Sequence, residues 1–140
     1  MSIVYFDSSA LVKLVVEEDG SDVADALWDG CDAAVSSRLT YPEVRAAVAA
    51  AARDHRIDSR SLQTVRRDWE TIWSETRPVE LESSVEHHAG ELAEIHALRG
   101  ADAVQLASAL AIGSSDLIVA TWDRRLREGV IAAGLRVAPA

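Results

Sequence analysis

Residues 3–16 read IVYFDSSALVKLVV, and this stretch decides the expected fold. Its first four residues are β-branched or aromatic and include no turn former, which is typical of a short strand buried on both faces of a parallel sheet. Asp7 ends the run. Ser8 and Ser9 follow, and both can cap a helix by accepting bonds from its first backbone N–H groups. The stretch therefore predicts a strand, a carboxylate at its carboxyl end, and a helix.

Asp7 has a structural and a functional interpretation. Asp is a common helix N-cap, and this role is the more frequent explanation for a single Asp in such a place. In an open α/β sheet, however, ligands bind in the crevice outside the carboxyl ends of the strands, so Asp7 is also predicted at the mouth of that crevice. The functional interpretation depends on whether other acids reach the same edge.

Length and composition indicate one soluble, globular domain over residues 1–140. A chain of 140 residues can bury roughly two thirds of its unfolded surface in one core. Apolar residues make up 49% and charged residues 26%, which argues against disorder, and no apolar run is long enough to span a bilayer. No signal-peptide pattern precedes the first strand, and the single Cys31 excludes an internal disulfide. We therefore expect a cytoplasmic protein without a membrane partner.

The charge distribution leaves two interpretations open. With 23 acids and 14 bases the formal net charge is -9, which argues against capture of nucleic acid by the whole surface. Eight of the bases fall within forty residues: Arg38, Arg45, Arg53, Arg56, Arg60, Arg66, Arg67 and Arg77. They could form one basic edge suited to a phosphate backbone, or a solvated helix face in which Asp54, Asp58 and Asp68 balance them.

Strands and helices are expected to alternate along the chain. The expected strands cover residues 3–6, 33–36, 79–81, 117–120 and 135–137. The expected helices cover residues 9–17, 22–28, 44–53, a stretch from 59 or 61 to the residue before Pro78, 84–98, 102–111 and 124–133. Thr40 and Glu43 match a capping box before the third helix, and Gly100 is expected to end the fifth. The alternation predicts a parallel sheet covered by helices on both faces.

Four acids occupy equivalent junctions between these elements. Asp7 and Asp123 follow expected strands, and Glu43 and Asp102 lie at expected helix starts. Capping explains each acid singly, but a doubly wound topology brings the two strand-end acids to one crevice. Crowded carboxylates raise one another's pKa unless a cation neutralises them, so four at one edge indicate a hard divalent metal. Mg²⁺ or Mn²⁺ is expected, because these ions prefer oxygen ligands and retain waters that a phosphate can replace.

Around these acids the sequence resembles the four acidic motifs of PIN-domain ribonucleases. The segments are YFDSSALVKL at Asp7, LTYPEVRAAV at Glu43, LRGADAVQLASAL at Asp102 and VATWDRRL at Asp123. The resemblance covers nearly the whole chain and is closest to the VapC toxins of bacterial toxin–antitoxin pairs. Four motifs in the right order make it fairly specific, whereas any one alone would be weak.

The resemblance implies a three-layer α/β fold with a five-stranded parallel sheet. It also implies Mg²⁺-dependent endonucleolytic cleavage of RNA, frequent homodimers, and inhibition by a small VapB-type antitoxin that obstructs the site. The four acids would then be metal ligands, directly or through water, with Mn²⁺ as the second candidate ion. The expected reaction is in-line attack of a water on an RNA phosphodiester.

Four further residues keep two interpretations each. Under the resemblance Ser8 and Ser9 would supply supporting hydroxyls to the site, and capping of the helix is an equally good explanation. Arg45 could hold a phosphate or pair with an acid. Thr121 could orient substrate or a ligand water, although a Thr at a strand end is usually structural.

Residues 53–79 match no motif of the family, so substrate choice stays open. Trp69 and Trp73 lie one turn apart in this stretch. Such a pair more often packs in a core than stacks on a nucleobase, and a groove for a second protomer or an antitoxin is an intermediate interpretation.

Two alternatives keep the fold and change the function: an RNA-binding module that does not cleave, and a housekeeping nuclease without an antitoxin. Acids facing phosphate give binding alone no advantage, so the four intact acids favour a nuclease. A phosphoacceptor signalling domain would need adjacent acids after the first strand and a lysine near the last. Here Ser8 follows Asp7, and Lys13 is the only lysine.

Overall fold

A computed structural model describes all 140 residues, and a five-stranded parallel sheet forms its centre. The strands are β1 (Ile3–Phe6), β2 (Ala33–Ser37), β3 (Arg77–Val79), β4 (Ile118–Ala120) and β5 (Arg136–Ala138). The helices are α1 (Ser8–Leu11), a 3₁₀ turn η1 (Val12–Leu14), α2 (Ser21–Gly30), α3 (Thr40–Arg53), α4 (Ser59–Ser74), α5 (Ser83–His96), α6 (Gly100–Ala111) and α7 (Arg124–Ala132). The sheet order is β3-β2-β1-β4-β5, with every neighbouring pair parallel.

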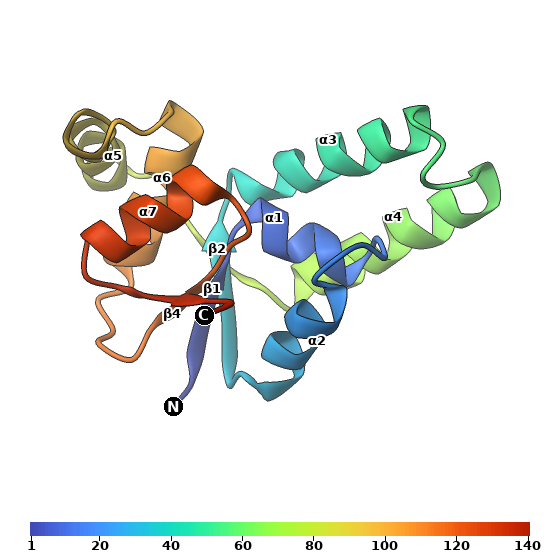
Figure 1. Ribbon diagram of the computed structural model, residues 1–140, viewed down its shortest axis with the longest axis horizontal. Coiled ribbons are helices and arrows are strands. Elements are labelled where there is room, and N and C mark those ends of the chain that lie inside the picture. The colour runs from blue at the N-terminus through green and yellow to red at the C-terminus, as the bar shows by residue number, and fades with distance from the viewer.

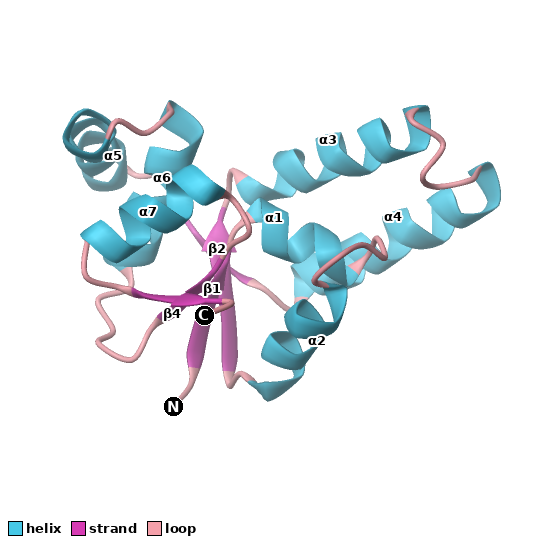
Figure 2. Ribbon diagram, viewed as in Figure 1, coloured by secondary structure: helices cyan, strands magenta, loops and turns pink.

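The helices form two layers on opposite sides of this sheet (Figures 1 and 2). One layer contains α5, α6 and α7, and the other contains α1, α2, α3 and α4, with α3 and α4 extending away from the sheet as a pair. The predicted three-layer α/β fold with helices on both faces is therefore confirmed. No helix is both long enough and apolar enough to cross a membrane.

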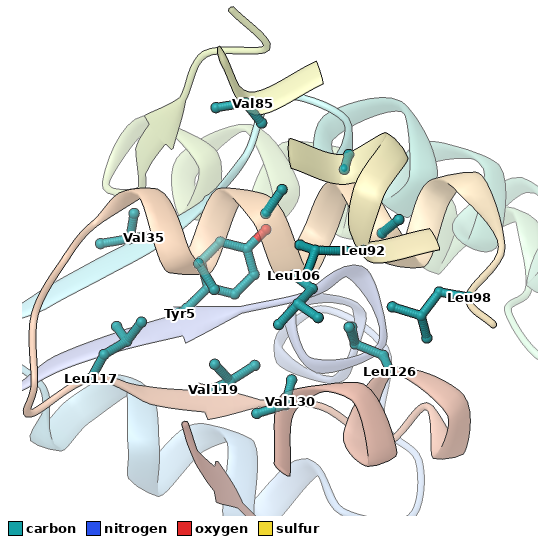
Figure 3. Packing of buried hydrophobic residues seen from close by; sticks show 14 residues of the cluster. Tyr5, Val35, Val85, Leu92, Leu98, Leu106, Leu117, Val119, Leu126 and Val130 are labelled. Atoms are coloured by element: carbon teal, nitrogen blue, oxygen red, sulfur yellow. The ribbon is translucent and has the colours of Figure 1, made fainter. Parts of the chain in front are cut away.

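Alternate residues of β1 supply the two hydrophobic cores. Tyr5 packs with residues of α5, α6 and α7 in the first cluster, where Figure 3 shows its ring beside Leu106 of α6. Val4 and Phe6 point to the opposite face and belong to the second cluster with α1, α3 and α4. Because successive side chains of a strand point to opposite faces, a strand buried on both sides has to be apolar throughout. The run of four apolar residues before Asp7 meets this requirement.

The carboxyl ends of β1 and β4 lie side by side at the centre of the sheet. Phe6 pairs with Ala120, and the Asp7 backbone N–H donates to the Ala120 carbonyl at 3.2 Å. Asp7 and Thr121 therefore leave the sheet at the same level. This is the edge at which open α/β sheets bind ligands.

Several expected boundaries were wrong, for local reasons in one case and because of strand pairing in another. The helix expected over 9–17 ends at Leu11 and continues as a 3₁₀ turn, in which the Val15 backbone N–H bonds to the Val12 carbonyl three residues earlier. Pro78 does not simply stop α4. Pro78 lies inside β3, which is an edge strand of the sheet. An edge strand has no neighbour on its outer side, so the missing N–H of a proline is tolerated there.

The capping box expected at Thr40 is also wrong. Leu39 is the N-cap of α3 and makes no side-chain cap bond, while Thr40 is the first helical residue and is fully buried. Its hydroxyl is hydrogen-bonded to Ser36 and Gln105 instead. Gly100 was expected to end α5, but Ala97 adopts the left-handed conformation there and Gly100 begins α6.

Candidate active site

Asp7 is the buried centre of the site. It is the N-cap of α1, and its side chain is 2% exposed. Oδ1 accepts hydrogen bonds from the Ser9 hydroxyl at 2.7 Å and the Ala10 backbone N–H at 2.9 Å, and Oδ2 accepts from the Thr121 hydroxyl at 2.5 Å. Burial raises the pKa of Asp7 to about 6, although these three hydrogen bonds act in the opposite direction. The carboxylate is therefore fixed in place but poorly solvated.

Glu43 reaches the same edge from the first turn of α3. It is half-buried, and its Oε1 accepts a hydrogen bond of 2.8 Å from the Gln105 amide. Burial is the largest cause of its raised pKa, and the charges of Asp102 and Asp123 add to it. Hydrogen bonds from Gln105 and Ser8 lower this pKa again. A capping role does not explain Glu43, because its side chain is bonded to α6 rather than to the start of α3.

Asp102 and Asp123 complete the group from α6 and α7. Asp102 lies in the first turn of α6 and is partly buried, and burial and the charge of Asp123 raise its pKa. Asp123 is the N-cap of α7, where Oδ1 accepts from the Leu126 N–H at 3.0 Å. The capping role of Asp123 is confirmed, but Arg99 rather than Asp102 is the N-cap of α6.

The charges of these acids act on one another. Burial is the main reason why the pKa values of Asp7, Glu43 and Asp102 are raised, and the negative charge of Asp123 raises all three further. None of the four carboxylates belongs to a salt bridge. Asp7 is buried and Glu43 and Asp102 are partly buried, and none of them is paired with a base, so the arrangement favours binding of a cation. We call these four residues the acid cluster.

Three of the four supporting residues contact the acid cluster. Ser9 bonds to Asp7, and its oxygen also accepts from the Trp122 N–H at 2.9 Å. Thr121 bonds to Asp7 and accepts from the Asp123 N–H at 3.0 Å. Ser8 is close enough to Glu43 to lower its pKa. The hydroxyls therefore connect acids that come from different elements.

Arg45 lies elsewhere, in a pocket of about 150 Å³ between α3 and α4. Its guanidinium donates to the Tyr41 hydroxyl at 3.2 Å and makes no salt bridge. Trp69, which lines the same pocket, is 2% exposed and packs against Tyr41 and Trp73. The expectation that Trp69 packs in the core is confirmed.

Three side chains near the acid cluster were not predicted from the sequence. Gln105 bonds to Glu43 from α6, and its only signal in the sequence is a polar residue within an apolar helix, one turn after Asp102. Arg99 and Arg125 are the other two, and their positive charges lower the pKa of Asp102. A positive charge close to Asp102 suits an approaching phosphate.

The donor chemistry of the acid cluster suits a hard divalent cation, since carboxylate and hydroxyl oxygens are the ligands that Mg²⁺ prefers. No group of three or more His, Cys, Asp or Glu side chains is arranged so that it could hold a metal ion. Mg²⁺ usually retains several waters and binds through one or two carboxylates, so the remaining acids would act through its hydration shell. Ligation of the cation by the four acids, directly or through water, stays a prediction.

Comparison with known proteins identifies the family. The model of the PIN domain family matches residues 4–130. Two curated proteins of Mycobacterium tuberculosis, Ribonuclease VapC45 (strain CDC 1551 / Oshkosh) and Ribonuclease VapC49 (strain ATCC 25618 / H37Rv), are each 66% identical over 140 residues, which is 100% of this chain and 97% of theirs. The chain therefore belongs to the PIN-domain family, and within it to the VapC proteins.

Solved structures share the fold at low sequence identity. FitAcB from Neisseria gonorrhoeae aligns over 96% of this chain and 95% of its own, with a TM-score of 0.72 and 19% identity. A toxin-antitoxin complex from Klebsiella pneumoniae aligns over 86% of each chain, with a TM-score of 0.60 and 20% identity. At these identities the comparison confirms the three-layer fold alone.

Proposed function

We propose that this protein is a divalent-cation-dependent endoribonuclease, the toxin of a toxin–antitoxin pair, with residues 1–140 acting as one PIN domain. One observation carries the nuclease proposal: hydrogen bonds join Asp7 through Thr121 to Asp123, and Glu43 through Gln105 to the helix of Asp102, and no salt bridge neutralises any of these acids. The VapC relatives, both named ribonucleases, support RNA as the substrate.

The residues of the acid cluster would hold Mg²⁺, or Mn²⁺ in its place. When bound, the cation would supply an activated water for in-line attack on the phosphodiester and stabilise charge on the leaving oxygen. Asp7 is the anchor, because three hydrogen bonds fix both of its oxygens. Asp123 is exposed and faces the solvent from which RNA arrives. Arg99 and Arg125 would bind the phosphate oxygens that the cation leaves free.

A binding module that does not cleave is the weaker alternative. RNA binding relies on positive charge that releases counterions from the phosphates. The acid cluster presents negative charge at the site, and burying Asp7 there gives phosphate binding no advantage. In a nuclease these acids have a role, because they bind the cation, and the bound cation makes the site attractive to a phosphate.

The nuclease proposal is tested with Asp7→Asn, Asp123→Asn and exhaustive chelation. Purified wild type should cleave RNA with Mg²⁺ or Mn²⁺ and lose this activity in excess chelator. The two variants should remain folded by circular dichroism and lose cleavage. Undiminished turnover after chelation, or retained cleavage in folded Asp7→Asn, would contradict the proposal.

The toxin proposal has a separate test in cells. Induced wild type should arrest growth, and the same amount of Asp7→Asn should not. The relatives named VapC and the fold shared with a toxin-antitoxin complex support a VapB-type antitoxin partner, encoded next to this gene. We also propose a homodimer in the cytoplasm, which light scattering and cell fractionation would test. Harmless production of an active enzyme would indicate a housekeeping nuclease.

A further inference from the structure

The Gln105 side chain connects the two helices that carry Glu43 and Asp102. It lies on α6, one turn after Asp102, and is 3% exposed. Its Nε2 donates to Glu43 Oε1 at 2.8 Å and to Thr40 Oγ1 at 3.0 Å. Its Oε1 accepts from the Tyr5 hydroxyl, which Figure 3 shows directed from β1 toward α6. The amide therefore uses both its N–H groups and its carbonyl oxygen.

The orientation of this amide is determined by its neighbours. A carboxylate only accepts, so the NH₂ group has to face Glu43 and Oε1 has to face Tyr5. The Ser36 hydroxyl is 2.6 Å from the Phe6 carbonyl oxygen, which takes its one proton. The Ser36 and Thr40 oxygens are 2.8 Å apart, so the proton of that bond comes from Thr40. Thr40 is thus left to accept from Gln105, and a flipped amide would face Glu43 with its carbonyl.

We propose that Gln105 is a positioning residue for the cation site: its amide fixes the Glu43 carboxylate relative to Asp102, with Oε1 occupied and Oε2 left for the cation or its waters. This inference rests on the proposed metal-dependent function. Partners of this kind orient ligands in metal sites, and their loss typically costs about 10–100-fold in metal affinity or activity.

An amide suits this position better than the other side chains that could reach Glu43. Lysine or arginine would neutralise the carboxylate and remove the charge that attracts a cation. A glutamate would place one acceptor against another. A leucine or methionine would leave Thr40 and Glu43 without their donor in a buried place. Glutamine orients Glu43 and leaves its negative charge for the cation.

The test measures Mn²⁺ binding by the full-length protein without RNA, by counting free Mn²⁺ with electron paramagnetic resonance. Gln105→Met keeps an unbranched side chain of similar length and removes the amide. We expect about tenfold weaker Mn²⁺ binding, in line with the loss of other supporting partners. Tyr5→Phe keeps the packing of the core and removes only the hydroxyl that orients the amide, so it should weaken binding less.

The matched control is Leu110→Met, which places the same new side chain near the other end of α6. Leu110 packs against the first hydrophobic cluster and takes no part in the hydrogen bonds of Gln105. This variant should bind Mn²⁺ like the wild type. Raising the Mn²⁺ concentration should restore RNA cleavage by Gln105→Met, because the acids themselves remain. A purely structural defect would not respond to the cation.

The outcomes separate this inference from the proposed function. Wild-type affinity for Mn²⁺ in folded Gln105→Met and Tyr5→Phe would overturn the role of Gln105 and leave the nuclease intact. If Gln105→Met does not fold, the Mn²⁺ affinity of Tyr5→Phe decides whether the orientation of the Gln105 amide matters. A wild type that binds no Mn²⁺ would overturn the metal site, and the role of Gln105 with it.

Discussion

The Thr121 hydroxyl donates a hydrogen bond of 2.5 Å to Asp7 Oδ2, across 114 residues of sequence. The same oxygen accepts from the Asp123 backbone N–H at 3.0 Å. Thr121 therefore ties the acid that ends β1 to the acid that begins α7. Its side chain is fully buried, so water cannot replace it without rearrangement.

Thr121→Val should shift the pH dependence of RNA cleavage. The Thr121 hydrogen bond lowers the pKa of Asp7 against the effect of burial, so its loss should raise that pKa further. The acidic limb of the rate profile should then move to higher pH, with the rate at neutral pH lower by about 10–100-fold. Thr121→Ser retains the hydroxyl and should keep the wild-type profile. Identical pH profiles for Thr121→Val and the wild type would show that this hydrogen bond does not control the pKa of Asp7.

Asp7→Asn should stabilise the metal-free protein at neutral pH. Burial raises the pKa of Asp7 from 3.8 to about 6, so the folded state binds this proton more tightly than the unfolded state. The contribution of protonated Asp7 to the free energy of unfolding is fully present below about pH 4 and is lost as the pH rises through about 6. At 1.36 kcal/mol per unit, the ionised carboxylate costs about 3 kcal/mol above this window.

Urea unfolding across this pH range measures the effect. The free energy of unfolding of Asp7→Asn should exceed that of the wild type near neutral pH, and the two should converge in acid. Asp32→Asn is the control, because Asp32 is exposed and lies far from the acid cluster in the sheet. Equal stabilities of Asp7→Asn and wild type at neutral pH would contradict a destabilising buried charge.

Mg²⁺ should raise the melting temperature of the wild type. A ligand that binds only the folded state adds about 2.7 kcal/mol at a hundred times its dissociation constant, which corresponds to roughly 5–10 °C for a chain of this size. Asp7→Asn should respond much less. Differential scanning fluorimetry with Mg²⁺ and with matched NaCl separates binding from ionic strength, and equal shifts in both salts would refute a cation site.

The sequence predicted the strand-end acids well and the supporting network poorly. Asp7 and Asp123 each follow a buried strand and cap the next helix, so local pattern alone placed them at one edge. Glu43 and Asp102 were singled out by their places at expected helix starts, but for them the sequence alone did not decide between a capping role and a place in the site. Gln105 was missed because its partners lie 62 and 100 residues away, and no local rule connects them.

A distant hydrogen bond also explains the misplaced start of α3. Thr is a residue type that often caps helices. The buried Thr40 hydroxyl is instead hydrogen-bonded to Ser36 and Gln105, so it does not accept a bond from a backbone N–H at the start of α3. Local propensity is a weak guide wherever a polar side chain is buried, since its hydrogen bonds must be satisfied inside the protein. Errors of this kind therefore concentrate around the acid cluster.

Gly20→Ala should disturb both the stability and the activity of the protein. Gly20 has a φ of +92°, and an added Cβ would lie 2.7 Å from Trp122 Nε1. The strained backbone costs on the order of 1–3 kcal/mol. The clash should in addition displace Trp122, which lies between Thr121 and Asp123 and donates its backbone N–H to Ser9.

Gly134→Ala separates these two effects. Gly134 has a similar φ of +85°, but an added Cβ there meets no atom within 4 Å. Both variants should therefore unfold at lower urea concentration, while only Gly20→Ala should lose RNA cleavage under conditions where both are folded. Equal activities would mean that Trp122 can move without shifting Thr121 and Asp123. A loss confined to Gly20→Ala would show that the loop before α2 supports the acid cluster through the Trp122 ring.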